Sequence, residues 1–90
     1  MKNFILKTNG SSEEYNPRGR EYSLGELQTA VRGYIQIVRL PEYRVMVVND
    51  DGHPLKLDIN IKATKIYQEA YKSNWIIVGD VLVCDSKFIK

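Results

Sequence analysis

The alternation of apolar and polar positions is clearest between residues 23 and 52, where its period changes from helical to extended. The apolar positions that share one face of a 3.6-residue period are Leu24, Leu27, Ala30 and Val31. Ser23 precedes this run, and Glu26 three residues later completes a capping-box signature. Gly33 follows the cation Arg32 at the point where a helix end needs a residue with positive φ. The pattern predicts a helix over residues 24–32.

Past Gly33 the spacing becomes that of extended strands. Residues 34–39 alternate, Pro41 and Glu42 supply a turn, and residues 43–49 form a second run rich in β-branched side chains. Asp51 and Gly52 then end the run, since both residue types tolerate the positive φ of tight turns. This stretch predicts a β-hairpin.

The segment before residue 23 predicts one strand and a loop. The strand covers residues 3–8 and ends at the turn pair Asn9-Gly10. Residues 11–20 are almost entirely polar, and we expect a mobile loop there. This loop is either a solvated connection or a binding loop that carries two arginines, since both uses are common for loops.

The segment after residue 52 predicts two more strands, or three, and a second helix. Residues 55–57 indicate a short strand with Lys56 turned away from two leucines, and Asn60 suits the N-cap of a helix over residues 61–72. Residues 75–78 form a continuous apolar run, which is typical of a fully buried strand. Residues 81–84 resume the run as a strand or hairpin partner after Gly79 and Asp80 interrupt it.

Together these elements predict a single domain over residues 1–90. The fold class is α+β: a small, mostly antiparallel sheet of four to six strands with two helices packed on one face and one small core. The side chains expected in this core are Leu27, Val31, Ile35, Val45, Val47, Ile66, Ile77, Val81 and Val83.

Composition narrows the possible functions. Thirteen basic and eleven acidic residues give a net charge of +2, which makes no strong case for nucleic-acid binding. No run approaches the roughly 20 apolar residues of a membrane span, and the short apolar run near the amino terminus is not a signal peptide. One cysteine, Cys84, cannot form an intrachain disulfide. We therefore expect a cytosolic protein.

The residues that could carry catalysis are few, and we expect a protein that is not an enzyme and needs no cofactor or metal. Cys84 lies in an apolar strand, where cysteine behaves as a small hydrophobe. His53 is the one histidine and follows a turn. The aspartates in turn positions, where such residues usually bond to backbone N–H groups, are Asp50, Asp51, Asp80 and Asp85.

Five short motifs resemble a family of small phage and mobile-element proteins that is grouped as a domain of unknown function. In chain order they are Leu27-Gln28, Gly33-Tyr34-Ile35, Asn49-Asp50-Asp51-Gly52, Leu57-Asp58-Ile59-Asn60 and Ile76-Ile77-Val78-Gly79. The chain departs from the family pattern in two places: Arg32 stands where a second glycine is usual, and the first loop is longer. The resemblance implies a phage or mobile-element source and supplies no mechanism.

Polar and aromatic groups near the ends of the predicted elements indicate a binding protein. The candidate ligand-binding residues, which suit a planar anionic ligand, are Arg32, Tyr34, Asn49, Asn60 and Lys62. We expect an anti-defence protein of the host-cell cytosol that sequesters a small nucleotide-like ligand. The first alternative is an inhibitor that binds a host or defence protein, and the second is a nucleic-acid-binding protein. Abundant aromatic residues in so small a chain also predict a homo-oligomer, most simply a dimer.

Overall fold

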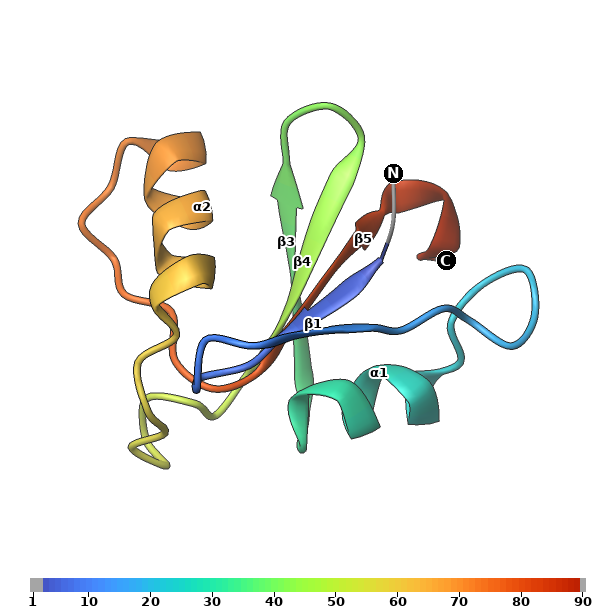
Figure 1. The fold of residues 1–90 in the computed structure, drawn as a ribbon, viewed down its shortest axis with the longest axis horizontal. Helices are drawn as coiled ribbons and strands as arrows, with labels where there is room; N and C mark the ends of the chain where they lie inside the picture. The colour runs from blue at the N-terminus through green and yellow to red at the C-terminus, as the bar shows by residue number, and fades with distance from the viewer. Residues whose placement is uncertain (1–2, 90) are drawn as a thin grey trace.

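The computed structural model describes residues 3–89, so the ends of the predicted domain, Met1, Lys2 and Lys90, lie outside the described residues. Five antiparallel strands form one sheet in the order β2-β1-β5-β4-β3, and two helices complete an α+β fold, as predicted (Figure 1). The strands are β1 Phe4–Leu6, β2 Ser12–Glu14, β3 Ile35–Leu40, β4 Arg44–Asn49 and β5 Val81–Asp85; the helices are α1 Leu24–Val31, α2 Ile61–Tyr71 and the 3₁₀ turn η1 Ser86–Phe88.

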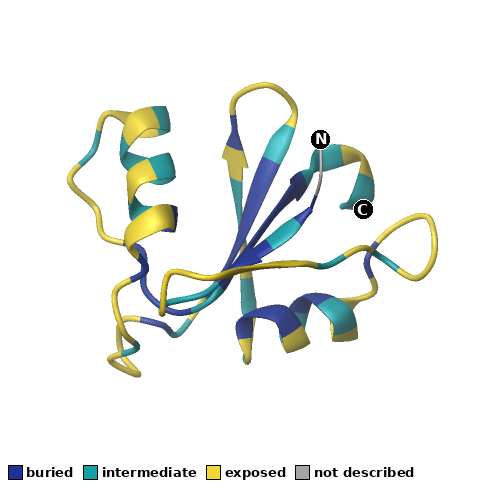
Figure 2. Cartoon of the chain, viewed as in Figure 1, coloured by how far each residue is buried: buried dark blue, intermediate teal, exposed yellow. Residues whose placement is uncertain are grey.

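The two helices cover opposite faces of the sheet, so the prediction that both pack on one face is wrong. Val45 and Val47 of β4 belong to the cluster that contains α1, whereas Met46 and Val48 belong to the cluster that contains α2. Successive side chains of a strand point to opposite faces, and residues 45–48 of β4 and 81–84 of β5 are all apolar. Each face therefore needs its own cover, and Figures 1 and 2 show the buried central strands between the two helices.

Two hydrophobic clusters replace the single predicted core. The buried residues on the α1 face are Ile5, Tyr22, Leu27, Ala30, Val31, Val45, Val47, Leu82 and Cys84. Those on the α2 face are Leu6, Leu40, Met46, Val48, Ala63, Ile77, Val81 and Val83. Seven of the nine predicted core residues are buried, and the other two, Ile35 and Ile66, pack against the clusters as partly buried side chains.

The predicted helix caps are confirmed, with one correction at the end of α1. The Ser23 hydroxyl accepts from the Glu26 N–H at 3.1 Å, and the Glu26 carboxylate accepts from the Ser23 N–H at 2.7 Å. The bond from the Ser23 N–H, together with one from the Arg18 N–H, lowers the pKa of the Glu26 carboxyl. At the other end Arg32, and not Gly33, takes the left-handed conformation, with φ 63°.

Two predicted strands are wrong. Residues 51–56 form successive turns, in which the Leu55 N–H donates to the Asp51 carbonyl. The segment 75–78 runs beside α2, where the Ile77 N–H donates to the Thr64 hydroxyl and Val78 makes one isolated bridge to Ile59. Its first apolar residue, Trp75, is 55% exposed, because the two faces of the sheet are already covered.

The predicted loop over residues 11–20 contains a strand. Asn9 and Gly10 turn the chain as predicted, and β2 pairs with β1 in antiparallel register. Beyond β2, Tyr15 stacks on Tyr22 with 5.8 Å between ring centroids, and its hydroxyl donates to the Glu26 carbonyl at 2.8 Å. The second half of this segment is thus attached to the start of α1.

Candidate ligand-binding site

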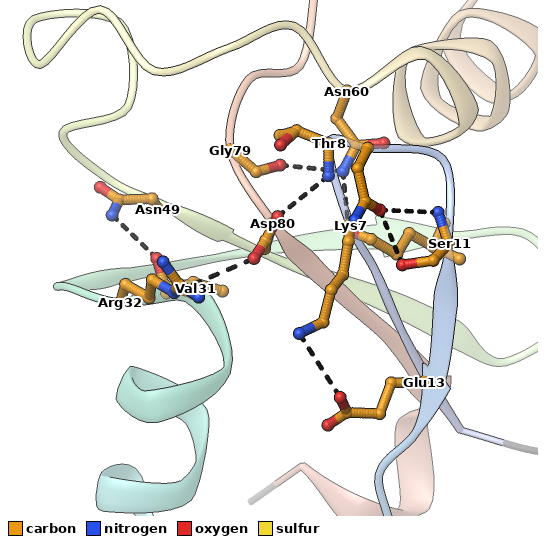
Figure 3. Close-up of polar contacts among 12 residues, drawn as sticks. Lys7, Thr8, Ser11, Glu13, Val31, Arg32, Asn49, Asn60, Gly79 and Asp80 are labelled. Atoms are coloured by element: carbon orange, nitrogen blue, oxygen red, sulfur yellow. Dashed lines mark hydrogen bonds and ion pairs between the residues drawn. The ribbon is translucent and has the colours of Figure 1, made fainter.

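A cavity of about 390 Å³ opens where the ends of four segments meet. The segments are the exit of β1, the end of α1, the turn that follows β4, and the start of β5. The residues that line it are Lys7, Thr8, Asn9, Val31, Arg32, Asn49, Leu55, Leu57, Asp58, Gly79 and Asp80. Figure 3 shows how the polar groups of this region face one another.

Arg32, the cap residue that follows α1, projects into this region. Its backbone is in the left-handed region, which costs a residue other than glycine roughly 1–2 kcal/mol, and its side chain is 78% exposed. Its Nε lies 4.0 Å from the Asp80 carboxylate. An ion pair with so exposed a cation contributes little to stability. Because the pair involves Nε, the other N–H groups of the guanidinium can bind a ligand.

Asp80 joins the two sides of the cavity. Its side chain is 15% exposed, and Oδ1 accepts from the Thr8 N–H at 3.0 Å while Oδ2 faces Arg32 (Figure 3). Nearby, Lys7 Nζ lies 3.4 Å from the Glu13 carboxylate. The cavity therefore contains two cations and two carboxylates, those of Asp80 and Asp58, rather than one uniform charge.

Asn49 fixes the wall between α1 and the sheet. It is 6% exposed; its Nδ2 donates to the Val31 carbonyl at 3.0 Å, and its Oδ1 accepts from the Asp51 N–H at 2.8 Å. A Cβ atom on Gly33 would lie 2.7 Å from this Nδ2. Position 33 requires glycine because of this close approach. A positive φ is not the reason, because Arg32 adopts it instead.

A second hollow of about 380 Å³ adjoins the first. Gln28, Gly33, Tyr34, Asn49, Asp51 and Leu55 line it. Asn49 and Leu55 line both hollows, so the two lie side by side, and together they are called the recess. The Tyr34 side chain is 69% exposed and the Leu55 side chain 61%, and both offer apolar surface beside the charged part of the recess.

The structure brings Arg32, Tyr34 and Asn49 together but places Asn60 and Lys62 elsewhere. Asn60 is fully buried; its Nδ2 donates to the Leu6 and Gly79 carbonyls, both at 2.8 Å, and its Oδ1 caps α2 through the Ala63 N–H. Lys62 is exposed on the first turn of α2 and lines neither hollow. Asn60 thus supports the cavity from behind, through Gly79.

Most of the lining residues were not among the sequence candidates, and Lys7, Asp80 and Leu55 show why. Lys7 and Asp80 lie far apart in sequence and meet because β1 pairs with β5. Leu55 was assigned to a strand, whereas the turns after β4 present it to the recess. The signal that could have indicated Asp80 is its place between Gly79, with φ 81°, and a buried strand.

Cys84 is buried on the α1 face, and desolvation by its apolar surroundings, with a smaller contribution from Asp85, raises the pKa of its thiol to about 12. The thiolate is the reactive form, so we expect a chromogenic disulfide to label Cys84 very slowly in the folded protein at pH 8. Denatured protein should be labelled within minutes as its control. Equal rates in the two samples would contradict the burial.

The other potentially reactive groups are dispersed. His53 Nε2 lies 2.8 Å from the Ile76 carbonyl, and its ring contacts Trp75 with 4.7 Å between centroids. Within residues 3–89 no three side chains of His, Cys, Asp or Glu are grouped to hold a metal ion. Over the same residues, no helix has the length and apolar character to cross a bilayer.

Comparison with known proteins gives a family but no characterised relative. A search of curated proteins and a search of solved structures each returned no match. A family model, described as a domain of unknown function, DUF3846, matches residues 1–88. That span includes every strand and helix that forms the recess. The expected membership in a domain-of-unknown-function family is confirmed, and the chain belongs to the DUF3846 family.

Proposed function

We propose that this protein binds a small anionic, nucleotide-like molecule in the recess and withdraws it from a host defence pathway without altering it. The observation that carries the proposal is that a charged hollow and a hollow with an exposed tyrosine lie side by side and share Asn49 and Leu55. A nucleotide likewise joins an anionic part to a flat, largely apolar one. In this proposal the protein is an accessory product of a phage or mobile element and acts in the host cytosol.

The charged hollow suits the phosphate end. Arg32 donates a fork of N–H groups that matches phosphate oxygens, and Lys7 adds a second positive charge at the same opening. The carboxylates of Asp58 and Asp80 accept hydrogen bonds, and the sugar hydroxyl groups that lie between the phosphate and the base of a nucleotide donate them. A ligand with both kinds of group matches this lining better than a simple anion does.

The second hollow suits the planar end. Tyr34 presents an exposed ring on which a base can stack, and such contacts contribute about 1–3 kcal/mol in proteins that bind single-stranded nucleic acids. Action by sequestration needs tight binding. A protein present at micromolar concentration must hold its ligand below a micromolar Kd, or at about −9 kcal/mol or better.

The test compares Arg32 with Lys72, two cationic residues that have the same backbone conformation. Arg32 and Lys72 both end a helix in the left-handed region, with φ 63° and φ 54°, but Lys72 lines neither hollow. Arg32→Gly and Lys72→Gly both remove a side chain from a backbone that glycine adopts freely. We expect each unliganded variant to melt at or slightly above the temperature of the unaltered protein.

Ligand should separate the two variants. A panel of cyclic and linear nucleotides at a hundredfold excess over Kd should raise the melting temperature of the unaltered protein by roughly 10 °C or more. Lys72→Gly should keep this shift and Arg32→Gly should lose most of it. The released ligand should be chemically unchanged by mass spectrometry. Absence of a shift with every nucleotide, or equal shifts in both variants, would contradict the proposal.

The second candidate, inhibition of a host or defence protein, is favoured by an apolar surface. Its exposed side chains are Leu55, Ile59, Ile61, Trp75 and Ile76. The bridge between Ile59 and Val78 and the contact between His53 and Trp75 hold their segments together. Apolar surface of this kind marks many protein-binding sites. Stoichiometric capture of a host protein that Trp75→Ala abolishes, without any nucleotide shift, would favour this candidate.

A further inference from the structure

Strand β3 is an outer strand of the sheet, and the ladder on its inner side shows which of its backbone groups face outward. The Asp50 N–H donates to the Tyr34 carbonyl, and the Ser86 N–H donates to the Tyr43 carbonyl. Hydrogen-bonded pairs alternate along an antiparallel ladder. The even-numbered residues of β3 therefore bond to β4, while Ile35, Ile37 and Arg39 point their N–H and C=O groups away from the sheet.

This outer edge has few of the features that prevent strand pairing. Proteins commonly protect edges with proline, lysine, bulges or covering segments. The sequence of β3 is Ile-Gln-Ile-Val-Arg-Leu, with one charged residue and no proline. A covering contact occurs at one end, where the Tyr71 hydroxyl of α2 donates to the Arg39 carbonyl. Within the described residues, Ile35 and Ile37 have no such cover on their outward groups.

We propose that two copies of the chain join through β3, in antiparallel register about a two-fold axis at Gln36. In this register Ile35 of each copy faces Ile37 of the other, and their outward groups form four hydrogen bonds. The neighbouring registers are poorer. An axis at Ile37 needs the Arg39 carbonyl that Tyr71 already occupies, and an axis at Ile35 needs the Gly33 N–H that donates to the Gln28 carbonyl.

The same register brings exposed side chains into contact. Gln36 lies opposite Gln36 of the second copy, where two amides can bond to each other. Tyr34, 69% exposed in one copy, lies opposite Val38 of the second copy, and aromatic residues opposite β-branched ones stabilise antiparallel pairs. Because Tyr34 also lines the recess, the second copy would stand at the rim of the proposed ligand site. The pairing itself does not depend on the proposed function.

The proposed dimer is closed. Both β3 edges are used in the ten-stranded sheet, and the strands left at its ends are the two copies of β2. Each β2 is three residues long and carries Glu13 and Glu14, so like charges and short length oppose further pairing. A two-fold contact that uses each edge once ends at two subunits.

Sedimentation and amide hydrogen exchange together test the pairing. The unaltered protein should sediment as a dimer at tens of micromolar. In the dimer, the Ile35 and Ile37 amides should exchange at least tenfold more slowly than in the monomer obtained by dilution. The Gln36 and Val38 amides should be protected in both states. A monomer at 100 micromolar, or a dimer whose Ile35 and Ile37 amides exchange at the monomer rate, would overturn the proposal.

A proline variant isolates the edge. Ile37→Pro removes an outward N–H and keeps the hydrogen bonds between β3 and β4 intact, as proline does on natural edge strands. We expect this variant to be a monomer, with Ile37→Val as the control that keeps the N–H and remains a dimer. A folded, dimeric Ile37→Pro variant would overturn the register. If Ile37→Pro does not fold, the exchange rates of the unaltered protein still decide.

Discussion

Replacing Asn60 by alanine should lower the free energy of unfolding by about 3–5 kcal/mol. The side chain is fully buried, and its amide satisfies the Leu6 and Gly79 carbonyls while its oxygen caps α2. A buried carbonyl without a partner costs about 1–3 kcal/mol, and a lost N-cap costs about 1. Urea denaturation of Asn60→Ala measures the loss, which is large beside the 5–15 kcal/mol typical of a whole domain.

Two controls separate the roles of Asn60. Lys62→Ala alters an exposed residue two positions along and should change stability by less than about 0.5 kcal/mol. Asn60→Ser keeps an oxygen for the Ala63 N–H but loses both donors, so its stability should fall between those of Asn60→Ala and the unaltered protein. A loss below about 1 kcal/mol in Asn60→Ala would mean that water reaches the two carbonyls.

Leu82→Ala should cost about 2–5 kcal/mol, the range found for buried leucines. Leu82 lies in β5, with β1 on one side and β4 on the other, and no part of it is exposed. The surrounding side chains come from strands held on both sides, so they cannot readily close the cavity that alanine leaves. Chemical denaturation with an unchanged m-value would identify the loss as one of native packing.

The matched control is the same substitution on the surface. Leu55 is 61% exposed, and Leu55→Ala should change stability by less than about 0.5 kcal/mol. Because the two substitutions remove the same atoms, the difference between them reports burial alone. Equal losses at the two positions would contradict the placement of β5 at the centre of the sheet.

Local signals predicted most of the elements. The capping box at Ser23, the N-cap at Asn60 and the hairpin of residues 34–49 depend on contacts between near neighbours in sequence, and all three are present. The sequence predicts the left-handed residue at Gly33, one position after Arg32, which adopts it. Position 33 is glycine because Asn49 occupies the space beside it, a contact that no local pattern shows.

Features that depend on contacts between residues far apart along the chain could not be predicted from the sequence in the same way. Residues 45–48 of β4 are all apolar, a pattern that indicates burial on both faces of a sheet, and residues 75–78 show the same pattern without forming a strand. Those residues share the pattern, but their backbone groups bond mainly to side chains, as when the Ile77 N–H donates to the Thr64 hydroxyl and its carbonyl accepts from that hydroxyl. The meeting of Lys7, Arg32 and Asp80 follows from the order of the strands, which no local pattern specifies.

The order of strands in the sheet also determines when the protein can fold during its synthesis. Strand β5 is the last strand along the chain, yet it lies between β1 and β4, with Phe4 paired to Val83. Until β5 leaves the ribosome, the β1–β2 and β3–β4 hairpins have no common partner, and two-stranded hairpins are marginally stable alone. Such distant pairings slow folding and leave strand edges exposed meanwhile. A chain interrupted just after α2 should therefore expose unpaired edges on both β1 and β4, and the cell should treat it as a substrate for chaperones and proteases.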